Sequence, residues 1–334
     1  MIEVRNLTKR YGSHIAISDL SFTIEKGVIY GFLGPNGAGK STTMNIITGC
    51  LGATEGDVLI DGHSITEEPK AAKKLIGYLP EMPPLYVDMT PKEYLSFVLE
   101  AKKVPHQEWS SELARVMEKT KITDVQDRLI CNLSKGYRQR VGIAQALIGN
   151  PEIVILDEPT VGLDPAQIIE IRDLIKELGQ EHTIILSSHI LSEVQAVCQS
   201  IMIISKGHLV ASDTAENLTD LLAGGTTIRV EAAADEDAVR NVLAPVEGID
   251  DIHPVRAENG VTEMELVPKD QFDIRPGVFR AFAASDVVLL EMNSVHASLE
   301  DVFLELTQNE AEPEIERGKK LRRQKKTEEA GEDI

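Results

Sequence analysis

The sequence is poor in aromatic residues, cysteines and long apolar runs. Aromatic residues make up 4% of the 334 positions, which disfavours a protein that binds nucleic acid by base stacking. Cys50, Cys131 and Cys198 are far apart and form no CxxC pair, so we expect reduced thiols rather than a disulfide or a metal site. No run approaches the roughly 18 apolar residues of a membrane span, and the first residues lack the apolar core of a signal peptide. We therefore expect a soluble chain whose role at a membrane requires a partner.

Positive charge is also scarce. The chain has 34 lysines and arginines against 54 aspartates and glutamates, a formal net charge of -20. An acidic body repels phosphate backbones and anionic lipid, so we expect no nucleic-acid partner and only indirect contact with a membrane. A single nucleotide is not excluded, because one phosphate pocket needs only a local positive potential. The length favours about two domains, and 42% apolar residues are enough for sizeable cores.

The first two thirds of the chain alternate between expected strands and helices. VIYGFLG, LIGYLP, IVILDE, TIILSSH and IMIIS are apolar runs without polar alternation, which is typical of a parallel sheet covered on both faces. Helices are expected over 40–51, 137–149 and 165–178. The opening residues alternate more and predict flanking antiparallel strands, while 91–132 carries helical patterns only. We expect an α/β domain over 1–222 with an antiparallel β subdomain and a helical insertion at about 83–132.

The pattern of expected strands and helices changes after this domain. Residues 226–307 predict a small α+β domain of βαββαβ order, with helices over 235–243 and 271–283 and a closing helix near 298–307. We find no catalytic constellation in it. The tail over 309–334 is polar, with a basic cluster followed by acids, and composition predicts that it is disordered.

The strongest motif is GPNGAGKS over 34–41, which fits GxxxxGK[ST] between an apolar strand and a helix. Glycines let successive backbone N–H groups approach phosphate oxygens, and the helix N-terminus adds a favourable dipole. Lys40 is expected on the β- and γ-phosphates, and the Ser41 hydroxyl on Mg²⁺. The residues expected to hold the phosphates are Gly34, Pro35, Asn36, Gly37, Ala38, Gly39, Lys40, Ser41 and Thr42. The alternative, a glycine-rich turn with a chance lysine, does not explain the flanking strand and helix.

Two adjacent acids end the apolar strand IVILDE. Side chains alternate along a strand, so Asp157 and Glu158 can perform different tasks. We expect Asp157 to hold Mg²⁺ through water, and Glu158 to orient or deprotonate the attacking water. Two acids at the end of a strand are often only a solvated strand end. The complete phosphate loop earlier in the chain favours a functional role for this pair. His189 ends the strand TIILSSH; a lone histidine there is commonly structural, but it could link Glu158 to a γ-phosphate.

Together these motifs resemble the ATP-binding subunits of the ABC transporter superfamily, in family order over 2–213. Tyr11 matches the aromatic residue that stacks on adenine, His189 the switch histidine, and VGLD over 161–164 the D-loop. LSKGYRQR over 133–140 resembles the family signature LSGGQ. In the family, this segment forms a second anion site at a helix N-terminus, facing ATP bound to the opposite subunit, and so Ser134 and Gly136 would bind the ATP of a second copy.

The resemblance implies a P-loop NTPase fold, ATP and Mg²⁺ as cofactors, and a homodimer that sandwiches two ATP molecules. It also implies an integral membrane permease as partner, docked near 83–97, and a cytoplasmic location on the inner face of the cell membrane. GYLPE, the signature and the C-terminal appendage resemble the ABC-2 exporter branch. The catalytic residues carried over are Lys40, Glu158 and His189.

Three positions depart from the family pattern. Lys135 and Tyr137 replace a glycine and a glutamine of the commonest signature, and Val161 replaces a small residue. Glu81 stands where the family usually has glutamine, and its role is open between metal sensing, as a third metal-site residue beside Ser41 and Asp157, and coupling to the permease. Two other functions compete with the transport motor: a soluble ABC ATPase in regulation or assembly, and a binding module that does not hydrolyse ATP.

Overall fold

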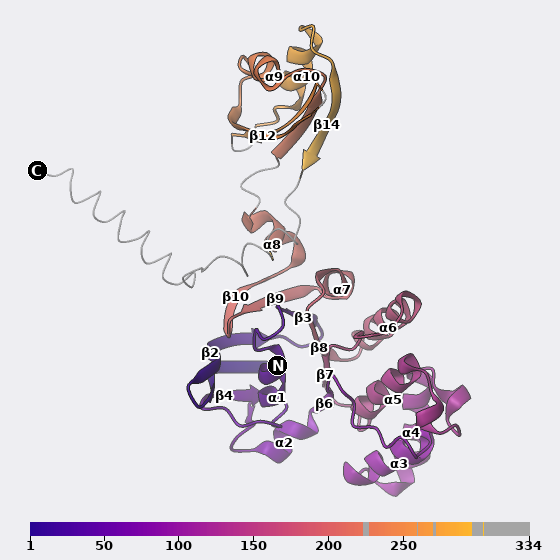
Figure 1. Cartoon of the computed structure of the whole chain (residues 1–334). Helices are drawn as coiled ribbons and strands as arrows, with labels where there is room; N and C mark the ends of the chain where they lie inside the picture. The colour runs from indigo at the N-terminus through magenta and orange to yellow at the C-terminus, as the bar shows by residue number, and fades with distance from the viewer. Residues whose placement is uncertain (223–226, 259, 270–271, 296–302, 304–334) are drawn as a thin grey trace, which may run out of the picture. The chain divides into compact units, whose positions relative to one another are not determined.

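The computed structural model describes residues 1–222, 227–258, 260–269, 272–295 and 303 (Figure 1). Contacts divide the chain into two compact units, the first built on Met1–Ala215 and the second on Glu216–Glu305. The expected closing helix near 298–307 lies outside the described residues except for position 303, and the charged tail over 309–334 lies wholly outside them. Within the described part of the chain, no helix has the length and apolarity needed to cross a bilayer.

A six-stranded sheet forms the centre of the first unit, in the order β10-β9-β3-β8-β7-β6. Its strands are β3 (Ile29–Leu33), β6 (Ile76–Leu79), β7 (Ile153–Asp157), β8 (Thr183–Ser188), β9 (Ser200–Ser205) and β10 (His208–Asp213). The first five are the predicted apolar runs, and they pair in parallel, as expected for a sheet buried on both faces. β10 pairs antiparallel with β9 at the edge of the sheet. The sequence pattern did not predict this strand.

Helices cover both faces of this sheet. They are α1 (Lys40–Ile47), α5 (Lys135–Leu147), α6 (Pro165–Leu178) and α7 (Leu191–Val197). Ile153 and Ile155 of β7 pack in the core that contains residues of α1, whereas Val154 and Leu156 pack in the core that contains residues of α5 and α6. The alternation of side chains along a strand explains this division. It also predicts that Asp157, the next residue of the odd-numbered set, faces α1.

A second sheet, of order β2-β1-β4-β5, is antiparallel, as the alternating opening residues predict. Its strands are β1 (Ile2–Tyr11), β2 (His14–Ile24), β4 (Glu55–Ile60) and β5 (His63–Ser64), and α2 (Pro69–Lys74) follows them. Apolar side chains of β1, β2 and β4 share a core with Met44 and Ile47 of α1. This sheet therefore supports the helix that follows the phosphate loop.

The helical insertion contains α3 (Pro91–Ala101) and α4 (Trp109–Lys119), with short 3₁₀ turns at His106–Glu108, Thr123–Val125 and Ile130–Asn132. Residues 91–132 contain no strand, as their helical patterns predict. α3 begins with a capping box, in which Glu93 N donates to Thr90 Oγ1 at 3.2 Å and Thr90 N donates to Glu93 Oε2 at 2.8 Å. In Figure 1, α3 and α4 lie beside α5, whose N-terminus is the signature segment.

The second unit begins with α8 (Ala215–Leu222), whose first residue belongs to the first unit, and continues in the expected βαββαβ order. Its elements are β11 (Thr227–Ala232), α9 (Glu236–Leu243), β12 (Ile249–Glu258), β13 (Val261–Pro268), α10 (Arg275–Ala283) and β14 (Leu289–Val295). The strands form one antiparallel sheet of order β12-β13-β11-β14. The core contains Val230, Met264 and Leu266 from the sheet and Leu243 and Phe282 from the helices. α10 starts at Arg275, later than expected; Gln271 is outside the described residues.

His182 connects the beginnings of the two strands that carry the candidate catalytic residues. It is buried just before β8, and its Nδ1 lies 2.7 Å from the carbonyl oxygen of Pro151, just before β7. Because a carbonyl oxygen only accepts, Nδ1 must donate this hydrogen bond. In the neutral ring Nε2 is then an acceptor, and this buried atom has no hydrogen-bond partner among the described residues. Burial lowers the pKa of His182 below its ordinary value. The folded state therefore holds the ring neutral.

We expect His182 to make folding sensitive to acid. Its pKa is lower in the folded than in the unfolded state, so this stability is fully present above the unfolded value of about 6.5 and is lost as the pH falls below it toward the folded value. The His182→Gln variant should lose this part of the slope, at most about 1.4 kcal/mol per pH unit, in urea unfolding between about pH 7.5 and 5.5. The matched variant of the exposed His208, His208→Gln, should keep the parent slope. Equal slopes in parent and His182→Gln would contradict the assignment.

Candidate active site

The phosphate loop connects the end of β3 to the start of α1. Its turn requires glycine at two positions, because Gly37 and Gly39 have φ angles of 82° and 107°. A Cβ on Gly39 would also lie 2.8 Å from the carbonyl oxygen of Ala16. Gly39 is the N-cap of α1 and provides no side chain to bond its first amides. Those N–H groups remain available to an anion, with the helix dipole behind them. The expected helix over 40–51 ends early, at Ile47, since Gly49 is left-handed with φ 67°.

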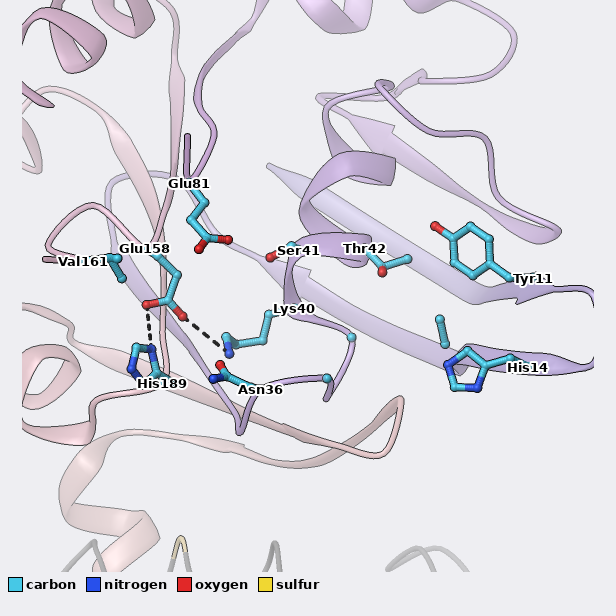
Figure 2. Close-up of a pocket in the computed structure, with 13 residues that line it drawn as sticks. Tyr11, His14, Asn36, Lys40, Ser41, Thr42, Glu81, Glu158, Val161 and His189 are labelled. Carbon is cyan, nitrogen blue, oxygen red and sulfur yellow. Dashed lines mark hydrogen bonds and ion pairs between the residues drawn. The ribbon is translucent and has the colours of Figure 1, made fainter. Parts of the chain in front are cut away.

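A cavity of about 620 Å³ opens above this loop (Figure 2). Its lining residues are Tyr11, His14, Ala16, Asn36, Gly37, Gly39, Lys40, Ser41, Thr42, Glu81, Glu158, Val161 and His189. Ten of them are residues that the sequence singled out for nucleotide, metal or catalysis. The structure thus brings together segments from β1, the phosphate loop and the ends of β6, β7 and β8. The predicted residues that are not among the lining residues are Gly34, Pro35, Ala38, Ser134, Gly136 and Asp157.

Lys40 is a buried cation at the floor of the cavity. Its side chain is 6% exposed, and Nζ donates to the carbonyl oxygen of Gly34 at 2.8 Å, with that of Pro35 at 3.4 Å. Nζ also lies 3.5 Å from Glu158 Oε1. A buried ammonium with these partners is held in place and supplies the local positive potential that the acidic chain needs for phosphate.

Glu158 is the centre of the charged groups. Its side chain is 7% exposed, and while Oε1 faces Lys40, Oε2 lies 2.9 Å from His189 Nδ1, as the dashed lines of Figure 2 show. The side chain of His189 is 38% exposed, so the ring reaches from Glu158 toward the open part of the cavity. Glu158 has φ 50°, a left-handed conformation that costs a residue with a Cβ about 1 kcal/mol or more. Such strain is typical of functional positions that neighbouring groups hold in place.

Asp157 faces α1, as the alternation along β7 predicts. Its Oδ1 lies 3.4 Å from Ser41 Oγ and accepts a hydrogen bond from Ser187 Oγ of β8. Among the described residues, no group of three or more His, Cys, Asp or Glu side chains forms a metal cluster. One hydroxyl and one carboxylate nevertheless suit Mg²⁺, which commonly takes one or two protein oxygens and completes its shell with phosphate and water. The donor set at Ser41 and Asp157 fits Mg²⁺ delivered with a nucleotide.

Glu81 and Tyr11 lie at opposite ends of the cavity. Glu81 follows β6, and Figure 2 shows its carboxylate turned toward Ser41. Tyr11 is half-exposed, and Lys9 Nζ lies 5.2 Å from the centre of its ring. Tyr11 and the phosphate loop line the same cavity.

The signature segment begins α5 rather than lining this cavity. α5 starts at Lys135, two residues earlier than expected, because Ser134 is its N-cap and accepts from Tyr137 N at 3.3 Å. A Cβ on Gly136 would lie 2.9 Å from the side chain of Gln167, near the start of α6. Ser134 and Gly136 therefore present a second helix N-terminus outside their own chain's cavity.

Sequence reasoning missed several residues of the site. His14 and Ala16 of β2 line the cavity, and they carry no motif that marks them. Ser187 Oγ also accepts a hydrogen bond from Glu158 N at 3.0 Å, so one hydroxyl contacts both acids. The only signal for Ser187 was its place, two residues before His189 at the end of an apolar strand.

Comparison with known proteins identifies relatives of this chain. The family model described as ABC transporter matches residues 17–161. A Bacillus subtilis protein, Uncharacterized ABC transporter ATP-binding protein YhcH, is 37% identical over 310 residues, 92% of this chain and 96% of the relative. Linearmycin resistance ATP-binding protein LnrL of Bacillus subtilis is 31% identical over 92% of this chain and 98% of its own length. Bacitracin transport ATP-binding protein BcrA of Bacillus licheniformis is 39% identical over 63% and 68% of the two chains.

Solved structures share the fold of the first unit. An ATP-binding subunit of an ABC transporter has a TM-score of 0.61 and 29% identity, covering 67% of this chain and 95% of its own. The ATP-binding cassette MJ0796, as a post-hydrolysis dimer with ADP and Pi, has a TM-score of 0.58 and 26% identity over 64% and 98% of the two chains.

We expect Lys40→Ala to weaken ATP binding by about 10- to 100-fold, because a charge-assisted hydrogen bond contributes about 1.5–3 kcal/mol. Titration with a fluorescent ATP analogue measures the loss directly. Lys26→Ala is the matched control, since Lys26 is exposed and pairs with Asp61 and Glu152 outside the cavity. If Lys40→Ala binds the ATP analogue as tightly as the parent does, the assignment of the phosphate loop to the ATP-binding site is wrong.

Proposed function

The chain belongs to the ABC transporter family of ATP-binding proteins, and on that premise we propose that it drives an exporter as the motor of a separate membrane permease. It is an ATPase with the nucleotide-binding fold of that family. The observation that carries the proposal is the buried Glu158, held between Lys40 and His189 in the cavity over the phosphate loop. The relatives named for bacitracin transport and linearmycin resistance support export rather than uptake.

In this proposal, ATP lies with its base near Tyr11 and its phosphates over 34–42. The loop amides and Lys40 Nζ bind the β- and γ-phosphates, which replace the Gly34 carbonyl among the partners of Nζ. Ser41 and Asp157 would hold Mg²⁺, which when bound neutralises phosphate charge and fixes the orientation of the γ-phosphate. Glu81 is placed to contact the metal shell or the γ-phosphate from the end of β6.

Hydrolysis requires a base beside the γ-phosphate. Glu158 lines the cavity and is near Lys40, so its carboxylate is placed to orient a water molecule and accept its proton. His189 bonds the other carboxylate oxygen and is half-exposed, which lets it contact both the base and the γ-phosphate. Lys40 stabilises the charge that develops on the transferred phosphoryl group.

We propose that the working unit is a homodimer. Ser134 and Gly136 begin α5 at a distance from their own chain's cavity, so their helix N-terminus is available for a phosphate bound by another copy. Lys135 adds a positive charge at this position. A dimeric relative bound to ADP and Pi supports the arrangement. ATP would then join two subunits, and loss of the γ-phosphate would release them.

The permease would dock on exposed apolar residues of the connection from β6 to α3 and of α3 itself. Met82 is 85% exposed, and Tyr86, Val87 and Phe97 are close to half-exposed. The rings of Tyr86 and Phe97 lie 5.2 Å apart, so part of this surface is contiguous. It begins one residue after Glu81, which lines the cavity. The short segment that begins at Glu81 would therefore link the nucleotide state to the contact with the permease. The protein would lie on the cytoplasmic face of the membrane.

We expect Glu158→Gln to bind Mg-ATP within about threefold of the parent and to hydrolyse it at least about 100-fold more slowly, because loss of a general base costs about 10²–10⁴ in rate. The variant should accumulate as an ATP-bound dimer in size-exclusion chromatography with light scattering. Glu177→Gln, an exposed carboxamide substitution on α6, is the control. A variant that stays monomeric at saturating Mg-ATP would contradict the sandwich, and normal turnover would contradict the role of Glu158.

We expect Val87→Asp to abolish co-purification of a polytopic membrane protein from gently solubilised native membranes, while ATP hydrolysis by the isolated chain persists. The matched variant is Val255→Asp in β12, since Val87 and Val255 are 48% and 45% exposed. Stoichiometric capture by the parent and by Val255→Asp supports the permease. If the parent captures only soluble proteins, the second candidate function, regulation or assembly without a permease, replaces transport.

A further inference from the structure

Glu193 is a buried carboxylate behind the candidate active site. It lies in α7, one turn after His189, and is 4% exposed. Its Oε2 accepts a hydrogen bond from Ser188 Oγ at 3.1 Å and another from Thr160 Oγ1. The chemistry proposed for ATP hydrolysis does not use it, so another function must explain why a carboxylate is placed there.

Both of its partners adjoin a residue of the Glu158–His189 pair. Thr160 is two residues after Glu158, in the loop that follows β7, and Ser188 directly precedes His189 at the end of β8. Ser188 Oγ also accepts from Ile190 N at 3.0 Å, which fixes the backbone on the other side of His189. Glu193 therefore connects the two loops that carry the pair.

The alternation along β8 gives each face of the sheet its own connection. Ser187 bonds Asp157 and Glu158 N on the α1 face, while its neighbour Ser188 turns to the opposite face and bonds Glu193. Glu158 is thus held from both sides of the sheet. This matters because its backbone has φ 50°, a conformation that persists only where the surroundings over-determine it.

The chemical type of residue 193 suits this task. Over the described part of the chain, no ion pair is formed by Glu193, so the two hydroxyls are what compensates its burial. An ionised carboxylate only accepts, and one oxygen can hold two donors at the same time. Removing either hydroxyl leaves the carboxylate poorly satisfied, which couples the positions of the two loops.

We propose that Glu193 is a positioning residue for the Glu158–His189 pair and acts through Thr160 and Ser188. The inference rests on the proposed roles of Glu158 and His189 in ATP hydrolysis. Glu193 holds the loop after β7 and the loop after β8 at the separation that the hydrogen bond between Glu158 and His189 requires. It does not line the cavity over the phosphate loop, so we expect it to govern turnover and to leave ATP binding intact.

The test is steady-state ATP hydrolysis by the full chain with Glu193→Met, which is similar in length but has no oxygen acceptor, and with Thr160→Val and Thr160→Ser. We expect Glu193→Met and Thr160→Val each to lower kcat by about 10-fold, since a misplacement of about 1 Å can cost up to about 10²-fold, while KM stays within about twofold. Thr160→Ser keeps the hydroxyl and should retain parent turnover. Ser192→Ala, on the exposed side of α7, is the control. The double variant Glu193→Met/Thr160→Val should be no slower than Glu193→Met alone, because Glu193→Met already removes the bond to Thr160.

Other outcomes overturn the proposal. Parent kcat in Glu193→Met would show that the carboxylate does not position the pair. A loss of kcat matched by a rise in KM, or by a fall in the folded fraction seen by circular dichroism, would make Glu193 a general structural residue. Additive losses in the double variant would separate it from Thr160. If Glu193→Met turns over normally while Glu158→Gln is inactive, the proposed function survives and only the positioning role fails.

Discussion

The structure depends on one buried carboxylate and the partners that compensate it. Glu158 is almost fully removed from water, so its charge requires Lys40 on one side and His189 on the other. These residues come from the ends of β7, β3 with its loop, and β8, and the sheet order β3-β8-β7 makes the three strand ends neighbours. The same edge of the sheet carries the phosphate loop. The parallel sheet therefore brings three segments that are distant in the sequence together in one charged site.

Positioning of this site extends well behind the cavity. The apolar alternation of β7 sends Asp157 toward α1, and the serine pair at the end of β8 reaches both faces of the sheet. Ser187 supports the acids from one side, and Glu193 supports their loops from the other. The left-handed backbone of Glu158 is stable in this setting because bonds on both faces restrain it. A change of the bound nucleotide that alters the partners of Glu158 would also affect the positions of the loops after β7 and β8. A motor needs such coupling between its nucleotide state and its conformation.

Much of this architecture could be predicted from the sequence. The five apolar runs became the five parallel strands, and GPNGAGKS placed Lys40 and Ser41 at the start of a helix because a phosphate loop has few backbone solutions. The residues that escaped prediction lack a local pattern. Glu193 has the sequence context of an ordinary glutamate in the first turn of a helix, and only the fold shows that two hydroxyls bury it. His14 and Ala16 line the cavity through strand pairing, which sequence spacing does not encode. β10 was missed because an edge strand with partly exposed residues has a weak apolar signal.

The central claim is that each ATP is hydrolysed between the phosphate loop of one subunit and the signature segment of another. The most direct measurement mixes two inactive variants, Lys40→Ala and Ser134→Arg, and records ATP hydrolysis. A mixed dimer holds one intact site, made from the loop of one chain and the signature of the other. Random pairing then predicts about a quarter of the parent rate, because about half of the dimers are mixed and each has one working site of two. No activity above that of the separate variants, in a mixture shown to exchange subunits, would contradict the shared site and place hydrolysis within single chains.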